Sequence, residues 1–187
     1  MKKPAKTFLK IGISLIAITA LVVFLLHSST KAHSPEDTVS FQKGDLQLEV
    51  FYNRPYKKER EIFGNLVPYG EVWRTGANDA TTFSTNKDLM VDGSLLKAGK
   101  YTLWTIPMKD SWKVIFNSKM YPWGINLDEE VYHNPQHDAL VLQVPTRKMK
   151  NTLEQFTISF EDKNEFIFLR LAWDDTMVSV PLKREEI

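Results

Sequence analysis

From Thr38 onward, the chain is a succession of short runs in which apolar and polar residues alternate. The runs recur at roughly 8- to 12-residue spacing and are separated by turn-forming pairs such as Asp92-Gly93 and Lys163-Asn164. A period of two places one face of a strand in a core and the other toward water. The pattern predicts an all-β fold, an antiparallel β-sandwich or jelly roll of about nine or ten strands, with an open barrel as an alternative.

The best-specified part of this sheet is the pair of runs GKYTLWTIP and SWKVIFN around the turn Met108-Lys109-Asp110. Alternation places Tyr101 and Leu103 on one face of the first run and Trp104 on the other. Because both faces carry large side chains, we expect this strand to be covered on both sides.

Two long segments lack a strand period. Residues 53–70 are rich in proline, glycine and charge, and residues 118–136 form a connection with one expected helical turn at residues 128–132. Loops of this length in compact domains are uncommon and are usually functional or packed on themselves.

The N-terminus carries four lysines before a run of sixteen uncharged residues, Ile11 to Leu26. A helix that spans a bilayer needs about 20 apolar residues, and positive charge on the N-terminal flank keeps that flank in the cytoplasm. We expect a cytoplasmic flank (1–10), a transmembrane anchor or signal peptide (11–27), a linker (28–37) and an exported β domain (38–187). The protein is then a single-pass membrane protein with its β domain outside the cytoplasm, or a secreted one if the leader is cleaved.

Composition excludes several classes of function. The chain has no cysteine, which excludes disulfides, thiolate metal sites and a Cys nucleophile. Beyond residue 37 there are 19 basic against 21 acidic residues, so the domain lacks the charge of a nucleic-acid-binding protein. No cofactor motif is present, and the sequence gives no indication of oligomeric state.

The window YGEVWRTGANDATTF, residues 69–83, gathers groups that could bind a ligand. Arg74 offers a planar fork suited to an anion, Asn78 and Asp79 could orient a polar ligand, and Trp73 and Tyr69 could stack on a sugar. The same residues also suit a structural corner, in which Gly76 supplies a positive φ, Trp73 belongs to the core and Arg74 neutralises Glu71 or Asp79. Both interpretations remain open.

Three further residues extend the candidate ligand site. Arg54 and Arg60 lie in or next to the loop that leads to the window, and three guanidinium groups would form an anion site if the loop folded back. Trp123, together with Tyr121, is the aromatic pair of the second long segment that we most expect to be exposed.

Enzymatic signals are weaker. His133 and His137 have the His-x-x-x-His spacing of metal ligands, but Pro135 between them opposes the helix that this spacing requires, so we assign no metal site. Glu71 and Asp79 could form a carboxylate pair of the glycosidase kind, although a sequence cannot give their separation. We assign no catalytic residue and expect a non-enzymatic protein.

The segments YNRP, VPYGEVWRTGAN, AGKYTLWTIP, WKVIFN and FIFLRLAWDDTMVSVPL resemble a bacterial domain-of-unknown-function family, number twenty-nine eleven. The resemblance covers residues 40 to 183, and the family pattern includes Tyr69, Gly70, Trp73, Arg74, Gly76, Ala77 and Asn78, with Arg54, Pro55 and Gly64 upstream. It implies an exported, mainly β domain and carries no assigned activity.

The sequence thus favours a membrane-tethered, exported β domain that binds a small anionic or saccharide ligand. The first alternative is a structural or interaction domain of the cell envelope without a ligand pocket. The second alternative is a carboxylate-dependent hydrolase.

Overall fold

The computed structural model describes residues 4–121 and 131–185, and the side chains of these residues except 4–7, 9 and 23–31. The chain divides into two compact units, Met1–His33 and Ser34–Ile187. The predicted helical turn at residues 128–132 falls largely outside the described residues.

The first unit is one helix, α1 (Pro4–His33). No helix in the described part of the chain is long and apolar enough to cross a membrane. Within the described part of the chain, the transmembrane anchor predicted at residues 11–27 therefore has no support. Residues 23–27 of that prediction lie outside the described side chains.

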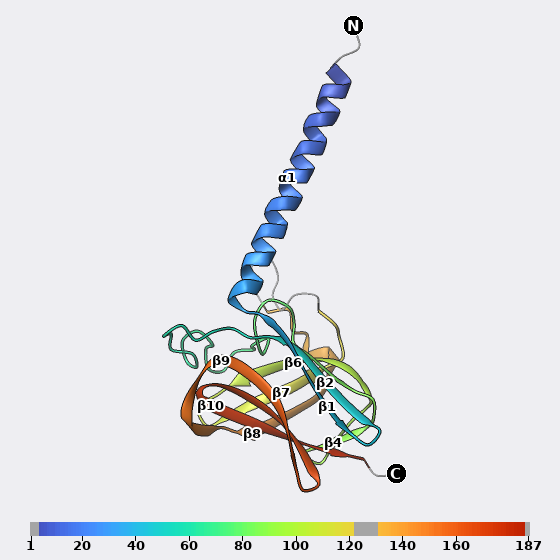
Figure 1. The fold of residues 1–187 in the computed structure, drawn as a ribbon. Coiled ribbons are helices and arrows are strands. Elements are labelled where there is room, and N and C mark those ends of the chain that lie inside the picture. Colours follow the sequence, from blue (N-terminus) through green and yellow to red (C-terminus); the bar gives the residue numbers. More distant parts are fainter. Residues whose placement is uncertain (1–3, 122–130, 186–187) are drawn as a thin grey trace. The chain divides into compact units, whose positions relative to one another are not determined.

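The second unit contains a six-stranded antiparallel sheet (Figure 1). Its strands in spatial order are β1 (Glu36–Lys43), β2 (Leu46–Asn53), β3 (Thr82–Thr85), β6 (Gly99–Pro107), β7 (Ser111–Asn117) and β8 (Asp138–Pro145). A single turn of 3₁₀ helix, η1 (Pro135–His137), precedes β8.

A second antiparallel sheet packs against the first. Its strands in spatial order are β5 (Ser94–Leu96), β4 (Leu89–Val91), β10 (Phe166–Arg184) and β9 (Arg147–Lys163). The long β9–β10 hairpin forms most of this sheet in Figure 1. The prediction of an all-β antiparallel fold is confirmed, with ten strands in two sheets among the described residues.

Buried side chains from both sheets form the main core. At one end of it lies an aromatic group contributed by both sheets and by the loop between β2 and β3. The Trp73 ring stacks on Trp173 at 6.0 Å between centroids, and Phe63 lies 4.9 Å from Trp112. Since aromatic rings bury large apolar areas, this group holds the loop against the core.

The two sheets are also joined by hydrogen bonds along one side. Beyond β2 the chain pairs with β9, where the amide of Phe156 donates to the carbonyl of Pro55 at 3.0 Å. The Tyr52 hydroxyl accepts from the amide of Ile158 at 3.0 Å, and burial raises the pKa of Tyr52. These contacts close the sandwich on the β2 side.

The turns follow the sequence signals. Asp92 and Gly93 both have positive φ, 48° and 80°, as a two-residue hairpin turn with the right twist requires. Gly44 between β1 and β2 and Asn164 between β9 and β10 also adopt positive φ, 62° and 60°. The turns predicted at Asp92-Gly93 and Lys163-Asn164 are confirmed as hairpins.

One strand boundary differs from the prediction. The alternating runs FIFLRLAW and MVSVPL, which flank Asp174 and Asp175, predict two strands by their sequence pattern, but the structure has the single strand β10 there. The pairing with β9 shifts register on either side of Asp174, whose φ is 55°. A bulge of this kind accommodates turn-forming residues without ending the strand.

Strand β6 is covered on both faces, as its side-chain pattern predicted. Leu103 points into the main core, whereas Trp104 is fully buried on the opposite face. There, Trp104 packs with Ala80, Ile115 and Tyr121 in a second apolar cluster, against which Val72 and Ile106 also pack. We call this the outer cluster.

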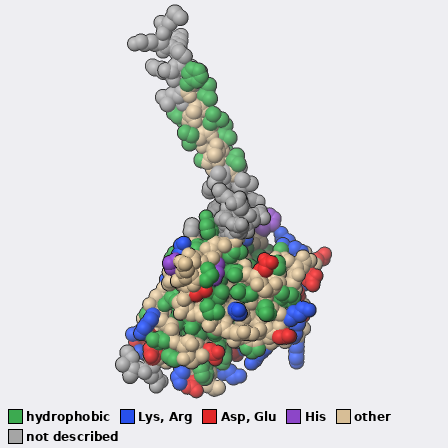
Figure 2. Space-filling view, turned by 180° about the vertical axis from the view of Figure 1, so that it is seen from behind, with side chains coloured by type: hydrophobic (Ala, Val, Ile, Leu, Met, Phe, Trp, Pro, Cys, Tyr) green, Lys and Arg blue, Asp and Glu red, His purple; other side chains and the backbone are tan. Residues whose placement is uncertain are grey.

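Lysine, arginine, aspartate and glutamate side chains of the β domain are interspersed over the face shown in Figure 2. Because both signs are interspersed, no large field of a single sign covers the described part of this face. Elsewhere in the β domain, charged side chains also form ion pairs between strands, such as Lys43 with Asp162 at 2.9 Å.

Candidate functional site

The window of residues 69–83, the arginine window, is fastened to the edge of the core at Trp73. The backbone of Trp73 exchanges two hydrogen bonds with Thr105 of β6, at 2.7 and 3.0 Å. The indole ring lies in the aromatic group of the core, and its Nε1 donates to the carbonyl of Gly76 at 3.1 Å. The contacts of Trp73 are those of a core residue.

Behind Trp73 the window packs through buried polar groups. Gly76 has φ 152°, and a Cβ there would lie 2.9 Å from the carbonyl oxygen of Asn53. Asn78, at φ 53°, donates through Nδ2 to Asn53 Oδ1 at 3.4 Å, and the Thr81 hydroxyl donates to the carbonyl of Thr75 at 2.7 Å. This part of the window makes the contacts of a tight structural corner.

The remaining candidate residues of the window are more exposed to solvent. Arg74 is half-buried and donates from Nη1 to the carbonyl of Asn78 at 3.4 Å, within its own loop. Asp79 is half-buried, Glu71 is exposed, and the partly exposed Tyr69 ring lies over Gly64.

The three candidate arginines bond to different partners. Arg54 bridges the sheets by donating to the Phe156 carbonyl at 3.2 Å, and it forms an ion pair with Asp37 at 3.2 Å. Arg60 donates to the carbonyls of Lys57 and Tyr56 in its own loop. Trp123 lies outside the described residues. The observed contacts of Trp73, Gly76, Asn78 and Arg54 are structural, and a ligand role for Arg74, Asp79, Tyr69 and Arg60 stays a prediction.

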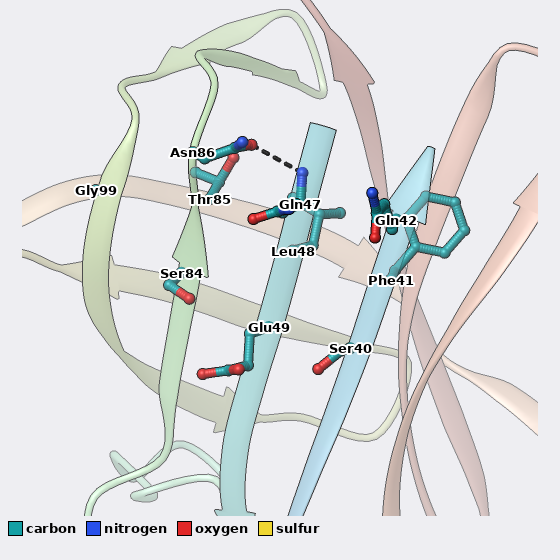
Figure 3. Close-up of a pocket in the computed structure, with 10 residues that line it drawn as sticks. All are labelled: Ser40, Phe41, Gln42, Gln47, Leu48, Glu49, Ser84, Thr85, Asn86 and Gly99. Atoms are coloured by element: carbon teal, nitrogen blue, oxygen red, sulfur yellow. Dashed lines mark hydrogen bonds between the residues drawn. The ribbon is translucent and has the colours of Figure 1, made fainter. Parts of the chain in front are cut away.

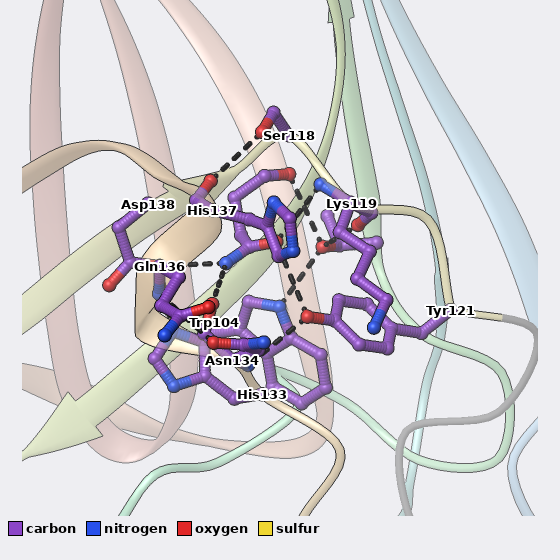
Figure 4. Close-up of polar contacts among 11 residues, drawn as sticks. Trp104, Ser118, Lys119, Tyr121, His133, Asn134, Gln136, His137 and Asp138 are labelled. Carbon is purple, nitrogen blue, oxygen red and sulfur yellow. Dashed lines mark hydrogen bonds and ion pairs between the residues drawn. The ribbon is translucent and has the colours of Figure 1, made fainter.

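A second group of polar residues lies at the end of β7, where the long connection leaves the sheet (Figure 4). The buried Asn117 amide donates to the Asn134 carbonyl at 2.9 Å and to Asp138 Oδ1 at 2.8 Å. Its oxygen accepts from the amide of Lys119 at 3.0 Å. The Tyr121 hydroxyl in turn accepts from the amide of Asn134 at 3.1 Å. We call this arrangement the Asn117 network.

The histidine pair falls in the same place. His133 Nε2 lies 2.8 Å from Asp138 Oδ1, with both side chains largely buried, whereas His137 is exposed. Among the described residues, no three His, Asp or Glu side chains gather closely enough to share a metal ion.

The Asn117 network ties both ends of the long connection to one strand end. Residues Lys119 and Tyr121 belong to its start, and Asn134 belongs to its finish. Because most of the bonding groups are matched within the chain, the network serves as a clamp for the loop.

A concave site lies elsewhere, on the outer face of β1, β2 and β3 (Figure 3). It is a hollow of about 540 Å³, within the range of roughly 300–1,000 Å³ typical of ligand sites. Among the residues that line it are Phe41, Leu48, Thr85 and Gly99. The other lining residues have polar side chains: Ser40, Gln42, Gln47, Glu49, Ser84 and Asn86. We call it the polar hollow.

Strand register brings these side chains together. Ser40 of β1 lies opposite Glu49 of β2, and Glu49 lies opposite Ser84 of β3. Gln42 and Gln47 form the neighbouring pair. Directly opposed residues of an antiparallel sheet point to the same face, so this row is set by the backbone pairing.

Much of the bonding capacity of the polar hollow is unused. In the described part of the chain, the side chains of Ser40, Gln47, Glu49 and Ser84 form no hydrogen bond or ion pair, whereas Asn86 accepts from the amide of Gln47 at 2.8 Å. Hydroxyl and amide groups offer both donors and acceptors to a ligand.

Sequence reasoning missed this site because exposed strand positions ordinarily solubilise a sheet. The sequence did contain one indication of the polar hollow. The outward positions of β1 and β2 near their shared turn are mostly uncharged polar residues: Ser40, Gln42, Gln47 and Glu49. The sequence did not show that β3 would add Ser84 to the same row, because β2 and β3 are separated by a long loop.

Charges beside the hollow are largely neutralised at the neighbouring turn. A hydrogen bond from Lys87 and the charge of Arg184 hold the pKa of Asp45 below its usual value. Asp45 lies 3.0 Å from Lys87 and 2.6 Å from Arg184. The charge of Asp45 is therefore neutralised by basic side chains of the same chain.

These features define an all-β domain of two antiparallel sheets with a polar hollow on the larger one. The family described as "Protein of unknown function (DUF2911)" matches residues 34–182, and the chain belongs to this family. The resemblance noted from the sequence is thereby confirmed. Neither the curated proteins nor the solved structures include a significant match to the chain.

The corner at Gly76 can be tested against a second glycine of the same window. Gly76→Ala should lower the free energy of unfolding by about 3 kcal/mol, because the added Cβ meets the Asn53 carbonyl in a left-handed conformation. Gly70→Ala is the matched control, since Gly70 also has positive φ (81°) but its Cβ would meet nothing within 4 Å. It should cost about 1 kcal/mol. Equal losses in urea unfolding would contradict the close approach.

The clamp role of Asn117 predicts a large loss of stability on truncation. Asn117→Ala removes hydrogen bonds to Asn134, Asp138 and Lys119 and leaves buried groups unpaired, so urea unfolding should show a loss of about 3 kcal/mol. Gln136→Ala is the control, because Gln136 is exposed and its hydrogen bond to Asn134 comes from the backbone amide, which the substitution keeps. It should change the free energy of unfolding by less than about 0.5 kcal/mol. A loss below about 1 kcal/mol for Asn117→Ala would show that the network does not hold the loop.

Proposed function

We propose that the β domain is a binding module for a saccharide and that the polar hollow is its binding site. The observation that supports this proposal is a row of hydroxyl, amide and carboxylate groups along one concave face, from Ser40, Gln47, Glu49 and Ser84, which have no side-chain partner among the described residues. A saccharide presents many hydroxyl groups that both donate and accept, which matches such a lining.

Between the two ligand classes that the sequence suggested, the lining favours a saccharide over a small anion. Among the described residues, no lysine, arginine or histidine lines the polar hollow, and the one charged group of the lining is the carboxylate of Glu49. An anion would gain no ion pair there and would be repelled by Glu49. The wall lacks an outward aromatic ring, since Phe41 packs on Phe160 at 5.8 Å, so binding would rest mainly on hydrogen bonds and be weak.

A purely structural role is the alternative for the arginine window, whose contacts suit a corner of the fold. A purely structural role accounts less well for the polar hollow. A strand face that only contacts water does not require a concave row of mostly uncharged polar side chains. The hydrolase alternative gains no support from Glu71 and Asp79, of which the first is exposed and the second half-buried.

We also propose that the β domain works outside the cytoplasm, on the strength of the four lysines that precede the uncharged run Ile11–Leu26. Fractionation of cells that express the full chain, with mass determination of the mature N-terminus, tests this. Recovery of the intact chain from the cytosol would contradict it.

The binding proposal is tested by titrating the protein with a panel of neutral, amino and acidic oligosaccharides in a calorimeter. We expect dissociation constants in the millimolar to high micromolar range for at least one saccharide class. Gln47→Ala combined with Ser84→Ala should weaken binding about tenfold, because each removes a hydrogen bond worth about 0.5–1.5 kcal/mol.

The matched control is Ser94→Ala, an exposed serine on β5 in the other sheet, which should leave the affinity unchanged. Absence of binding across the whole panel would refute the proposal. Binding that survives the double substitution would place the ligand elsewhere on the domain.

A further inference from the structure

In the part of the chain that the structure describes, Glu49 is the one charged residue that lines the polar hollow. It lies in the middle of the polar row, opposite Ser40 on one side and Ser84 on the other. A carboxylate only accepts hydrogen bonds, so a ligand in contact with it must donate.

The carboxylates around this end of the sheet are otherwise paired. Asp45 pairs with Lys87 and Arg184, Asp162 with Lys43 at 2.9 Å, and Asp88 with Lys97 at 2.7 Å. Glu49 has no ion pair in the described part of the chain. Its negative charge is therefore available in the hollow, whereas those of its neighbours are offset.

The nearest cation along the same row is Lys100, which lies opposite Ser84 on β6. Two strand spacings, roughly 10 Å between Cα atoms, separate it from Glu49. Lys100 does not line the hollow, and no ion pair joins it to Glu49. The charge of the hollow itself thus remains negative.

We propose that the polar hollow selects saccharides that carry an ammonium group, with Glu49 as the residue that determines this specificity. The proposal rests on the saccharide-binding function above. The amino group of a glucosamine unit would donate to the Glu49 carboxylate, while ring hydroxyls bond to Ser40, Gln47 and Ser84. Acetylation of that amino group removes its charge and with it the ion pair.

The probes are a trimer of glucosamine, its fully N-acetylated counterpart and a trimer of galacturonic acid, each titrated into the full chain at low ionic strength. We expect the glucosamine trimer to bind about fivefold more tightly than the acetylated trimer, as for an exposed ion pair. Galacturonic acid trimer should bind most weakly. Added salt should reduce the preference.

Glu49→Gln keeps the shape of the side chain and should abolish the preference while leaving the affinity for the acetylated trimer within about twofold. Lys100→Gln is the control and should preserve the preference. Equal affinities of the wild-type protein for both trimers, or a preference that survives Glu49→Gln, would overturn the assignment of Glu49. Failure of the glucosamine trimer to bind while another oligosaccharide of the panel binds would overturn the specificity alone, whereas failure of the whole panel would refute the underlying saccharide-binding function as well.

Discussion

Burial of Trp104 on the outer face of the six-stranded sheet is the constraint on which the arrangement of the domain depends. Strand β6 already points Leu103 into the main core, so a second large side chain on its other face must be covered from outside. The arginine window contributes Val72 and Ala80 to this cover, and the long connection after β7 contributes Tyr121. The described parts of both loops thereby cover one half of the outer face of this sheet.

The other half of the same face is left open as a result. Strands β1, β2 and β3 turn polar side chains outward, and the polar hollow lies among them. The polar hollow is built on paired strands whose backbone register sets the side-chain positions, which favours a preorganised site. The contacts of the described loop residues Trp73, Asn78 and Tyr121 are those of covers and clamps, whereas a ligand role for Arg74 and Asp79 stays a prediction.

Much of the fold could be predicted because the determining signals are local. Alternation identified the strands, and Asp92-Gly93 and Asn164 marked hairpins whose positive φ values the structure contains. The two-sided pattern around Trp104 correctly indicated a strand covered on both faces. The bulge at Asp174 was not predicted, because the pair Asp174-Asp175 is typical of a turn between strands. In the structure, pairing with β9 on both sides of Asp174 keeps the strand continuous. A family resemblance supplied the limits of the domain but no chemistry.

The candidate site could not be predicted in the same way, because it depends on pairing between strands far apart in sequence. Ser84 meets Glu49 only because β3 pairs with β2 across a loop of nearly thirty residues. Conversely, Trp73 and Asn78 looked suitable for a ligand in sequence, yet their positions in the structure are those of a core ring and a buried corner amide. Residue type alone does not distinguish an exposed polar group from one whose hydrogen-bonding capacity is already taken up by contacts within the domain.

The central claim is that the covered half of the sheet is structural and the open half is the binding surface. The most direct measurement is a two-dimensional NMR titration of the labelled β domain, within the full chain, with the glucosamine trimer. The account predicts shifts of the side-chain amides of Gln42, Gln47 and Asn86, with the indole Nε1–H of Trp73 and Trp104 unmoved. Shifts confined to those indoles, with the hollow unaffected, would contradict it.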